Sequence, residues 1–259
     1  MENFYGNDIE IKREMNKISL DTFVFDKHNV LDFPIDKLIE NLKLDINKLY
    51  DEHKKLIDLS SENPKRYEEL DEIAQQTGHS LHIQEYEYIQ DIHYIEDELF
   101  VLFEMKIIYS FKHLEINIKN LISASYEDKS VNKQFNWRDL NQYLTLKNID
   151  IKTINAYAEV DQLREVNNSL KHSTEIKNDN IKRITEFKSK EEITYRELEK
   201  FYKRIKEKPK EFLSSLSHKI YQDIYEFDNK KIIEIAKSYA SRMNKNDAKK
   251  LTIELLKLY

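Results

Sequence analysis

Residues 161–173, DQLREVNNSLKHS, bring together side chains that can handle a phosphate group. Arg164, Asn168 and His172 recur at every fourth position, so a helix through them presents a guanidinium, an amide and an imidazole on one face. A histidine exchanges protons near neutral pH, and an arginine binds phosphate oxygens through two parallel N–H bonds. These side chains predict RNA cleavage without a metal ion or other cofactor, in which the 2′-OH attacks the neighbouring phosphate.

The neighbours of these three residues extend the candidate site. Asn167 or Asn168 can orient the imidazole or hold a phosphate oxygen, and we expect Lys171 to bind substrate. The alternative is a polar face that only contacts water, with Glu165 neutralising Arg164. The other face of the same helix is expected to enter the core through an apolar stripe, formed by Val160, Leu163, Val166 and Leu170.

The composition predicts that the fold around this helix is all-α. Only two glycines and three prolines occur in 259 residues, so tight turns, hairpins and phosphate-binding loops lack the residues that they need. Hydrophobic residues make up 40% of the chain, which is enough for a sizeable core, and the 35% of charged residues suits long solvated helices.

Hydrophobic periodicity and helix breakers predict the elements before the candidate site. Pro64 interrupts an amphipathic pattern, and Gly78 is placed to stop a helix because glycine readily adopts the left-handed conformation. At about 1.5 Å per residue, the longest uninterrupted helix could reach about 70 Å. The pattern predicts, in order, irregular residues 1–34 with a short extended piece, a helix over residues 35–59, a short helix ending at Gln76, and one long helix from Ser80 to about Tyr126.

The elements after the long helix are predicted in the same way. They are a loop over residues 126–134, a helix from Trp137 to Leu146, the candidate-site helix over 156–172, a polar connector or strand pair over 175–192, a helix capped by Thr194 and interrupted at Pro209, and two short helices, the second starting near Asn246. We predict three parts: an N-terminal helical extension over residues 1–78, a helical bundle over 79–227 and a C-terminal helical extension over 228–259.

Charge and cysteine content narrow the classes of protein. The net charge of −6 and the mixing of acidic with basic residues argue against attraction of nucleic acid to the whole surface, but leave room for a local basic patch. The absence of cysteine excludes disulfides, cysteine-ligated zinc and cysteine nucleophiles. No stretch approaches the roughly 20 apolar residues of a membrane span, and the N-terminus lacks a signal-peptide pattern. We therefore expect a cytoplasmic protein that does not enter a membrane.

Three segments together resemble the HEPN superfamily of helical-bundle proteins. They are YSFKHLEINIKNLI in the long helix, the linking FNWRDLNQYLTLKNIDI, and LREVNNSLKHS, and the resemblance covers roughly residues 80–225. The resemblance implies a HEPN-like bundle from a prokaryotic toxin or defence system. Many members are metal-independent endoribonucleases that work as homodimers with the motif helices facing each other. Others are inactive modules that bind a partner such as an antitoxin or a subunit of a defence complex.

The family motif, an arginine followed after a short interval by a histidine, can be carried over to two residues. Arg164 matches the motif arginine, as the phosphate clamp, and His172 matches the motif histidine, as the acid and base. Glu165 occupies the next position, where the family more often has Asn, Asp or His, so Asn167 or Asn168 would take over that role. Seven residues separate Arg164 from His172, one more than is usual in the family. Both copies of His172 are expected near the two-fold axis of a homodimer.

Other clusters offer competing sites. His79, His82 and Glu85 have a spacing that could bind zinc on the face of a helix, and solvated side chains at a helix start are the alternative. Residues 195–212 interleave basic with aromatic residues, which can bind single-stranded RNA, but their glutamates favour a solvated helix.

Two carboxylates of the long helix are candidates for positioning the arginine of the site. A buried Glu104 or Glu115 could contact and orient Arg164, or Glu115 could pair with Lys112 or Lys119.

Overall fold

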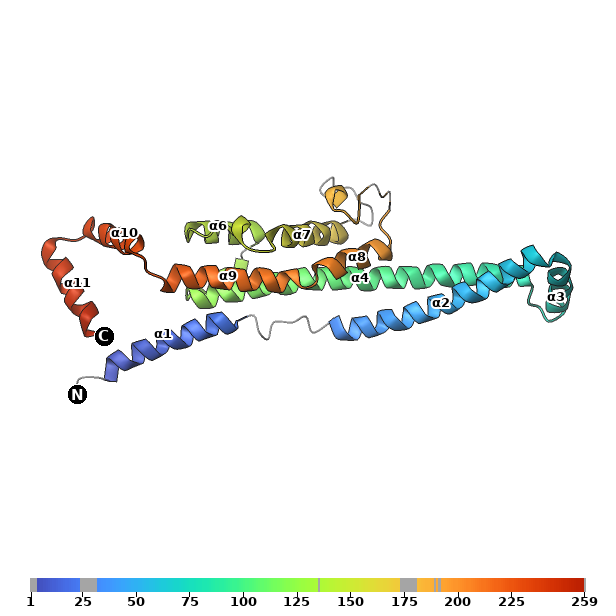
Figure 1. Ribbon diagram of the computed structural model, residues 1–259, viewed down its shortest axis with the longest axis horizontal. Coiled ribbons are helices and arrows are strands. Elements are labelled where there is room, and N and C mark those ends of the chain that lie inside the picture. The colour runs from blue at the N-terminus through green and yellow to red at the C-terminus, as the bar shows by residue number, and fades with distance from the viewer. Residues whose placement is uncertain are drawn as a thin grey trace. The chain divides into compact units, whose positions relative to one another are not determined.

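A computed structural model describes residues 4–23, 32–134, 136–172, 181–188, 190 and 192–258. Throughout these residues the regular elements are helices, and no strand occurs among them (Figure 1). The predicted all-α class is therefore confirmed. Within the described residues, no helix combines the length and the apolar character that crossing a membrane requires.

The chain forms two compact units that interleave in sequence. One unit contains residues 1–28, 114–158 and 208–259, and the other contains residues 29–113 and 159–207. We call them the terminal unit and the central unit. Two helices pass from one unit into the other; they are α4 (Leu81–Ser125) and α7 (Tyr157–His172). The sequence-continuous division at residues 78 and 228 stays a prediction.

Helix α4 has 45 residues and is about 68 Å long at 1.5 Å per residue. It begins directly after Ser80, as predicted, and the Ser80 hydroxyl accepts a hydrogen bond from the His82 N–H at 3.2 Å. Asp71 of α3 (Pro64–Gln76) accepts two further bonds there, from the Leu81 N–H at 2.6 Å and the Ser80 hydroxyl at 2.9 Å. Because the first N–H groups of a helix lack partners within it, Asp71 fixes where α4 starts.

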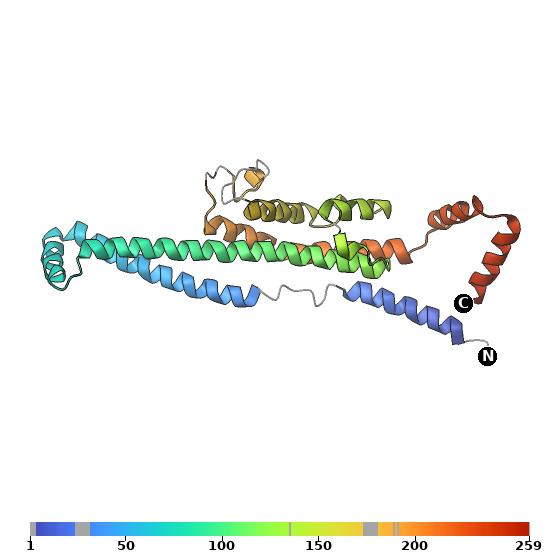
Figure 2. The ribbon, with the colours of Figure 1, turned by 180° about the vertical axis from the view of Figure 1, so that it is seen from behind.

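The main features of the central unit are a pair of long helices and a buried lysine between them. Helix α2 (Asp32–Glu62) lies beside the first part of α4, and α3 joins them at one end (Figures 1 and 2). Lys106 of α4 is only 3% exposed; its ammonium bonds Asp36, lies 3.4 Å from Asp32 and lies 4.6 Å from the centre of the Tyr202 ring. The remaining elements of this unit are α7, the short 3-10 helix η2 (Ile181–Arg183) and α8 (Tyr195–Ile205).

The terminal unit contains both ends of the chain and the second part of α4. Helix α1 (Phe4–Thr22) packs on α9 (Lys208–Tyr225), where the Ser217 hydroxyl donates to the Leu20 carbonyl at 2.7 Å. The Trp137 and Phe212 rings lie 6.5 Å apart. The other elements of this unit are α5 (Val131–Gln134), α6 (Trp137–Leu146), η1 (Ile151–Thr153), α10 (Asn229–Ala240) and α11 (Lys245–Lys257).

Three local predictions were wrong. Residues 4–22 form a helix instead of irregular structure, because packing on α9 supplies a partner for α1; residues 24–31 of the predicted extended piece lie outside the described residues. A short helix, α5, interrupts the predicted loop over 126–134. Of the predicted connector or strand pair over 175–192, the described residues form a turn-rich segment with η2, and Ile181, Ile184 and Phe187 are buried.

The interruption at Pro209 is confirmed and its local cause is visible. Helix α8 ends at Ile205 and α9 begins at Lys208, so Pro209 lies in the first turn of a helix, where no intrahelical N–H bond is lost. Thr194 caps α8, as predicted. The Glu197 carboxylate accepts bonds from the Thr194 hydroxyl and, at 3.1 Å, from the Thr194 N–H, which completes a capping box.

This capping box predicts a pH-dependent stability. Burial raises the pKa of Glu197, but bonds from Thr194 and Lys190 outweigh burial and leave that pKa below its usual 4.5. A lowered folded-state pKa stabilises the fold above the unfolded pKa, and this stability is lost as the pH falls through the folded value. We expect Thr194→Ala to lower the free energy of unfolding by about 1 kcal/mol near neutral pH.

The measurement is urea unfolding at about pH 7 and at about pH 3, where carboxylates become protonated. Glu197→Gln is expected to lose less stability between the two pH values than wild type does. Glu254→Gln, at an exposed position of α11, is the matched control and is expected to follow wild type. Equal pH dependence in wild type and Glu197→Gln would contradict this role for the capping box.

Candidate functional site

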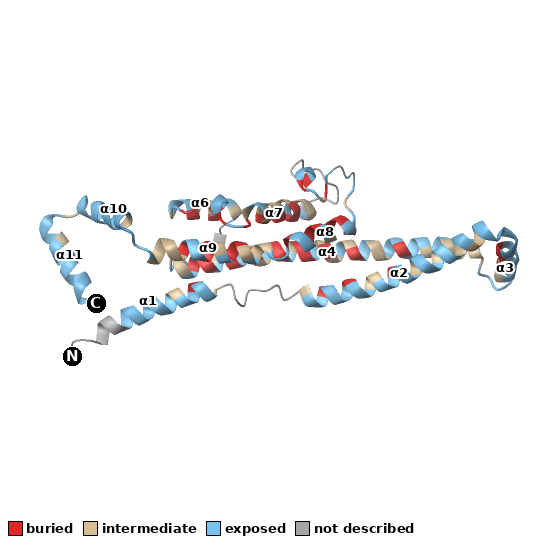
Figure 3. Cartoon of the chain, in the orientation of Figure 1, coloured by how far each residue is buried: buried red, intermediate tan, exposed pale blue. Residues whose placement is uncertain are grey.

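Helix α7 is held in the central unit by its apolar face. Val160, Leu163 and Val166 are fully buried, and Leu170 is partly buried, so the predicted stripe is confirmed (Figure 3). Packing on one side of a helix fixes its rotation and therefore the direction of its other side. The polar edge of α7 is thus presented by a rigid element, which suits a binding or catalytic surface.

Arg164 lies on this polar edge in a pair of ion contacts from its own helix. Its side chain is 24% exposed. Its Nε donates to Asp161 Oδ1 at 3.0 Å, its Nη2 lies 2.9 Å from the same oxygen, and Nη2 also donates to Glu165. The expected neutralisation by Glu165 is therefore present, with Asp161 added. Nη1 makes no hydrogen bond to the described residues, so one edge of the guanidinium keeps its donors.

The carboxylates predicted to orient Arg164 from elsewhere in the fold do not do so. Glu115 accepts a hydrogen bond from Lys119 at 2.6 Å, which is the alternative partner that the sequence offered. Burial raises the pKa of Glu104, and no contact joins that residue to Arg164. The guanidinium is therefore oriented by Asp161, three positions away on the same face of α7, and by the adjacent Glu165.

The two asparagines differ sharply in burial. Asn168 is exposed, whereas Asn167 is only 1% exposed and donates from Nδ2 to Asn168 Oδ1 at 3.2 Å. The expectation that Asn167 flanks the polar face was wrong, because its place between Leu163 and Leu170 continues the buried stripe. Its Oδ1 is buried and has no hydrogen-bond partner among the described residues. Asn168 is thus the amide that a ligand can reach, and the buried Asn167 holds it through this hydrogen bond.

His172 is the last residue of α7, and Lys171 beside it is exposed. The side chain of His172 lies outside the part of the chain that the structure describes. Eight residues along α7 place His172 about 12 Å from Arg164 along the helix axis, with Asn168 midway. One helix therefore spreads these groups over about two turns.

The zinc alternative is not assembled among the described residues. His82 Nδ1 lies 3.2 Å from the Tyr67 hydroxyl, which donates to Glu85 Oε1 at 3.0 Å. Burial, and then this bond to Glu85, raise the pKa of Tyr67 to about 12. No group of three His, Cys, Asp or Glu side chains that could hold a metal occurs in the described ranges, so the predicted set with His79 does not form.

The basic segment over residues 195–212 offers no stacking surface for RNA. Its aromatic side chains Tyr195, Phe201, Tyr202 and Phe212 are buried. Its cations are largely paired, as in the contacts of Arg196 with Glu96 at 3.1 Å, of Lys203 with Glu199 at 2.7 Å, and of Arg204 with Glu186 at 2.6 Å. The alternative interpretation, an ion-paired solvated helix face, is therefore confirmed.

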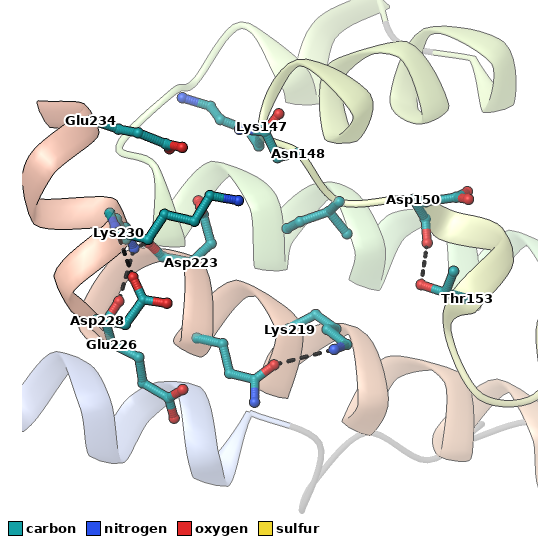
Figure 4. Close-up of a pocket in the computed structure, with 13 residues that line it drawn as sticks. Lys147, Asn148, Asp150, Thr153, Lys219, Asp223, Glu226, Asp228, Lys230 and Glu234 are labelled. Atoms are coloured by element: carbon teal, nitrogen blue, oxygen red, sulfur yellow. Dashed lines mark hydrogen bonds between the residues drawn. The ribbon is translucent and has the colours of Figure 1, made fainter. Parts of the chain in front are cut away.

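A pocket of about 710 Å³ lies in the terminal unit, between the loop after α6 and the junction of α9 with α10 (Figure 4). Its lining has four lysines and five carboxylates, and none of the predicted site residues is among them. Lys231 bonds the Asp223 and Glu226 carbonyls, and the ammonium of Lys147 lies 4.6 Å from the centre of the Tyr126 ring. The balanced charge of this pocket gives no preference for a phosphate.

Comparison with protein families, with curated proteins and with solved structures returns no match for this chain.

Proposed function

We propose that this chain is a HEPN-like, metal-independent endoribonuclease of a toxin–antitoxin or defence system, with its site on the polar edge of α7. The observation that carries the proposal is the state of Arg164. Its guanidinium is held by Asp161 and Glu165, yet Nη1 makes no hydrogen bond to the described residues, and exposed Asn168 lies one turn further along α7. A guanidinium that is oriented before substrate arrives suits a phosphorane, whose charge develops only during reaction.

The groups of this edge divide the reaction between them. His172 accepts the proton of the ribose 2′-OH, and the 2′-oxygen then forms a bond to phosphorus. The bond from phosphorus to the 5′-oxygen breaks, and the protonated His172 gives a proton to that oxygen, so the products are a 2′,3′-cyclic phosphate and a 5′-hydroxyl. Arg164 stabilises the negative charge on the phosphorane, Asn168 positions a phosphate oxygen, and Lys171 binds a neighbouring phosphate.

The separation of about 12 Å along α7 favours a site made by two copies of the chain. If two α7 helices face each other about a two-fold axis, His172 of one copy approaches Arg164 of the other, and each phosphate meets both groups. We include this homodimer in the proposal; its axis passes beside Asn168, so both copies of His172 lie about 6 Å from the axis along α7.

One experiment tests activity and assembly together. The purified chain is separated by size with light-scattering detection, and each fraction is incubated with mixed RNA in EDTA. Cleavage is expected in EDTA and in the dimer fraction, because no group in the mechanism requires a metal. Activity that disappears in EDTA and returns with zinc would contradict the mechanism, and activity confined to a monomer would contradict the two-copy site.

A second candidate function, an inactive HEPN-like module that assembles with a partner protein, has a different observation in its favour. The helices α10 and α11 carry many large apolar side chains and bury none of their residues. Exposed apolar surface of this extent marks an interaction site. An intact, dimeric chain that leaves mixed RNA uncut would favour this function over the first.

A further inference from the structure

The last two helices of the terminal unit form a hairpin that lacks a core. Neither α10 nor α11 contains a buried residue, although the two helices contact each other (Figure 3). Leu255 is 50% exposed and Leu256 is 70% exposed. Because short helices gain most of their stability from packing of an apolar face, this hairpin needs a surface to cover it. The exposed apolar residues are Ile232, Ile233, Ile235, Tyr239, Leu251, Ile253, Leu255, Leu256 and Leu258.

The same hairpin is strongly basic within an acidic chain. Residues 229–259 hold eight Lys and Arg residues against three Asp and Glu residues, whereas the whole chain has a net charge of −6. The first 228 residues therefore carry a net charge of −11. Lys249 and Lys250 of α11 make no ion pair with the described residues, so they are available to a partner of opposite charge. An acidic surface with apolar side chains would match this hairpin.

The central unit has a groove of that kind. It has a volume of about 600 Å³ and lies between α2 and α4, lined by Leu38, Leu42, Tyr94, Asp97, Glu98, Val101 and Leu102. Leu38, Tyr94 and Val101 are exposed there. Asp97 and Glu98 are also exposed and make no hydrogen bond or ion pair with the described residues. The groove thus combines an apolar floor with two free carboxylates at its edge.

We propose that the α10–α11 hairpin of one copy docks into the α2–α4 groove of a second copy. The apolar residues of α11 fill the floor, and Lys249 and Lys250 approach Asp97 and Glu98. The proposed exchange is reciprocal, so the symmetric dimer contains two identical hairpin–groove contacts. This contact does not depend on RNA cleavage, and it uses a different surface from α7.

A charge exchange between two variants tests the contact in the full-length chain. The groove variant is Asp97→Lys with Glu98→Lys, and the hairpin variant is Lys249→Glu with Lys250→Glu. Each alone places like charges opposite each other, so sedimentation analysis is expected to show dimerisation weakened by about tenfold or more. In an equimolar mixture every hairpin meets a groove of opposite charge, so a heterodimer of near wild-type affinity is expected.

Matched controls change the charge equally at other exposed positions of the central unit. They are Glu68→Lys with Glu69→Lys in α3 for the groove variant, and Lys54→Glu with Lys55→Glu in α2 for the hairpin variant. Both controls are expected to keep wild-type dimerisation, and circular dichroism checks that every variant is folded. Unchanged dimerisation of the two test variants, or failure of their mixture to associate, would overturn the proposal. Loss of binding to anionic vesicles or RNA without a change in dimerisation would also overturn it.

Discussion

The His172→Ala chain is expected to cleave RNA about 10²- to 10⁴-fold more slowly than wild type, because it lacks the group that exchanges protons with the 2′-OH and the leaving oxygen. Arg164→Lys is expected to lose about 10²-fold or more. Lysine keeps the charge but not the planar fork, and the contacts with Asp161 and Glu165 orient a guanidinium in particular. Initial rates on one labelled RNA measure both effects.

Two substitutions elsewhere serve as matched controls for this prediction. His218→Ala removes an exposed histidine of α9, and Arg138→Lys alters an exposed arginine of α6. Both are expected to keep the wild-type rate, because neither residue lies on α7. Equal rates for wild type and His172→Ala would contradict the proposed site, and so would equal losses in the test variants and their controls.

Phe187→Ala is expected to lower the free energy of unfolding by about 3–5 kcal/mol, the usual cost of removing a buried aromatic side chain. Phe187 has no exposed surface, and its ring lies 5.4 Å from that of Phe201 on α8. This prediction distinguishes a buried Phe187 from the exposed connector that the polar composition of residues 175–192 predicts. Thermal and urea unfolding provide the measurement.

The matched control is Leu146→Ala, since Leu146 is 76% exposed. Substitutions at such positions usually change stability by less than about 0.5 kcal/mol. A similarly small effect of Phe187→Ala would show that residues 181–188 do not pack as described. A large effect would support the packing of this segment against α8. Arg204 of α8 in turn donates to Gln162 of α7 at 2.9 Å, which links α8 to the site helix.

Helix boundaries that depend on a single backbone property could be predicted from the sequence. Pro64 and Pro209 lack a backbone donor, and Gly78 adopts a φ of +82°, so each marks a boundary whatever surrounds it. The caps at Ser80 and Thr194 are similarly local, because the serine or threonine oxygen accepts a bond within its own first turn.

Some features of the fold were not predicted from the sequence. They depend on contacts between distant segments, or on a spacing of apolar residues that is hard to recognise in a polar segment. Helix α1 lies where it does because α9, about 200 positions later, covers it. Ile181, Ile184 and Phe187 recur every third residue, which fits a tight helical turn, but three apolar residues in a polar segment are a weak signal. Asn167 could have been recognised as buried, since Val160, Leu163, Asn167 and Leu170 follow the three- and four-residue steps of a core stripe.

The candidate site shows the same limit. Types and spacing predicted the polar edge of α7 and the pairing of Glu165 with Arg164. They did not predict the second contact from Asp161, because a flexible arginine can reach several carboxylates and only the packed helix selects among them. The burial of Asn167 was missed because the residue is polar, although its spacing with Leu163 and Leu170 indicates a buried position.

The most direct test of the central claim is cleavage of paired RNA oligonucleotides in EDTA, one unmodified and one with a single 2′-deoxy residue at the mapped cleavage position. The proposed mechanism requires that the unmodified strand is cut to a 2′,3′-cyclic phosphate and a 5′-hydroxyl, while the modified strand stays intact at that position because its nucleophile is missing. Cleavage of the modified strand at the same position, or products with a 5′-phosphate, would contradict attack by the 2′-OH.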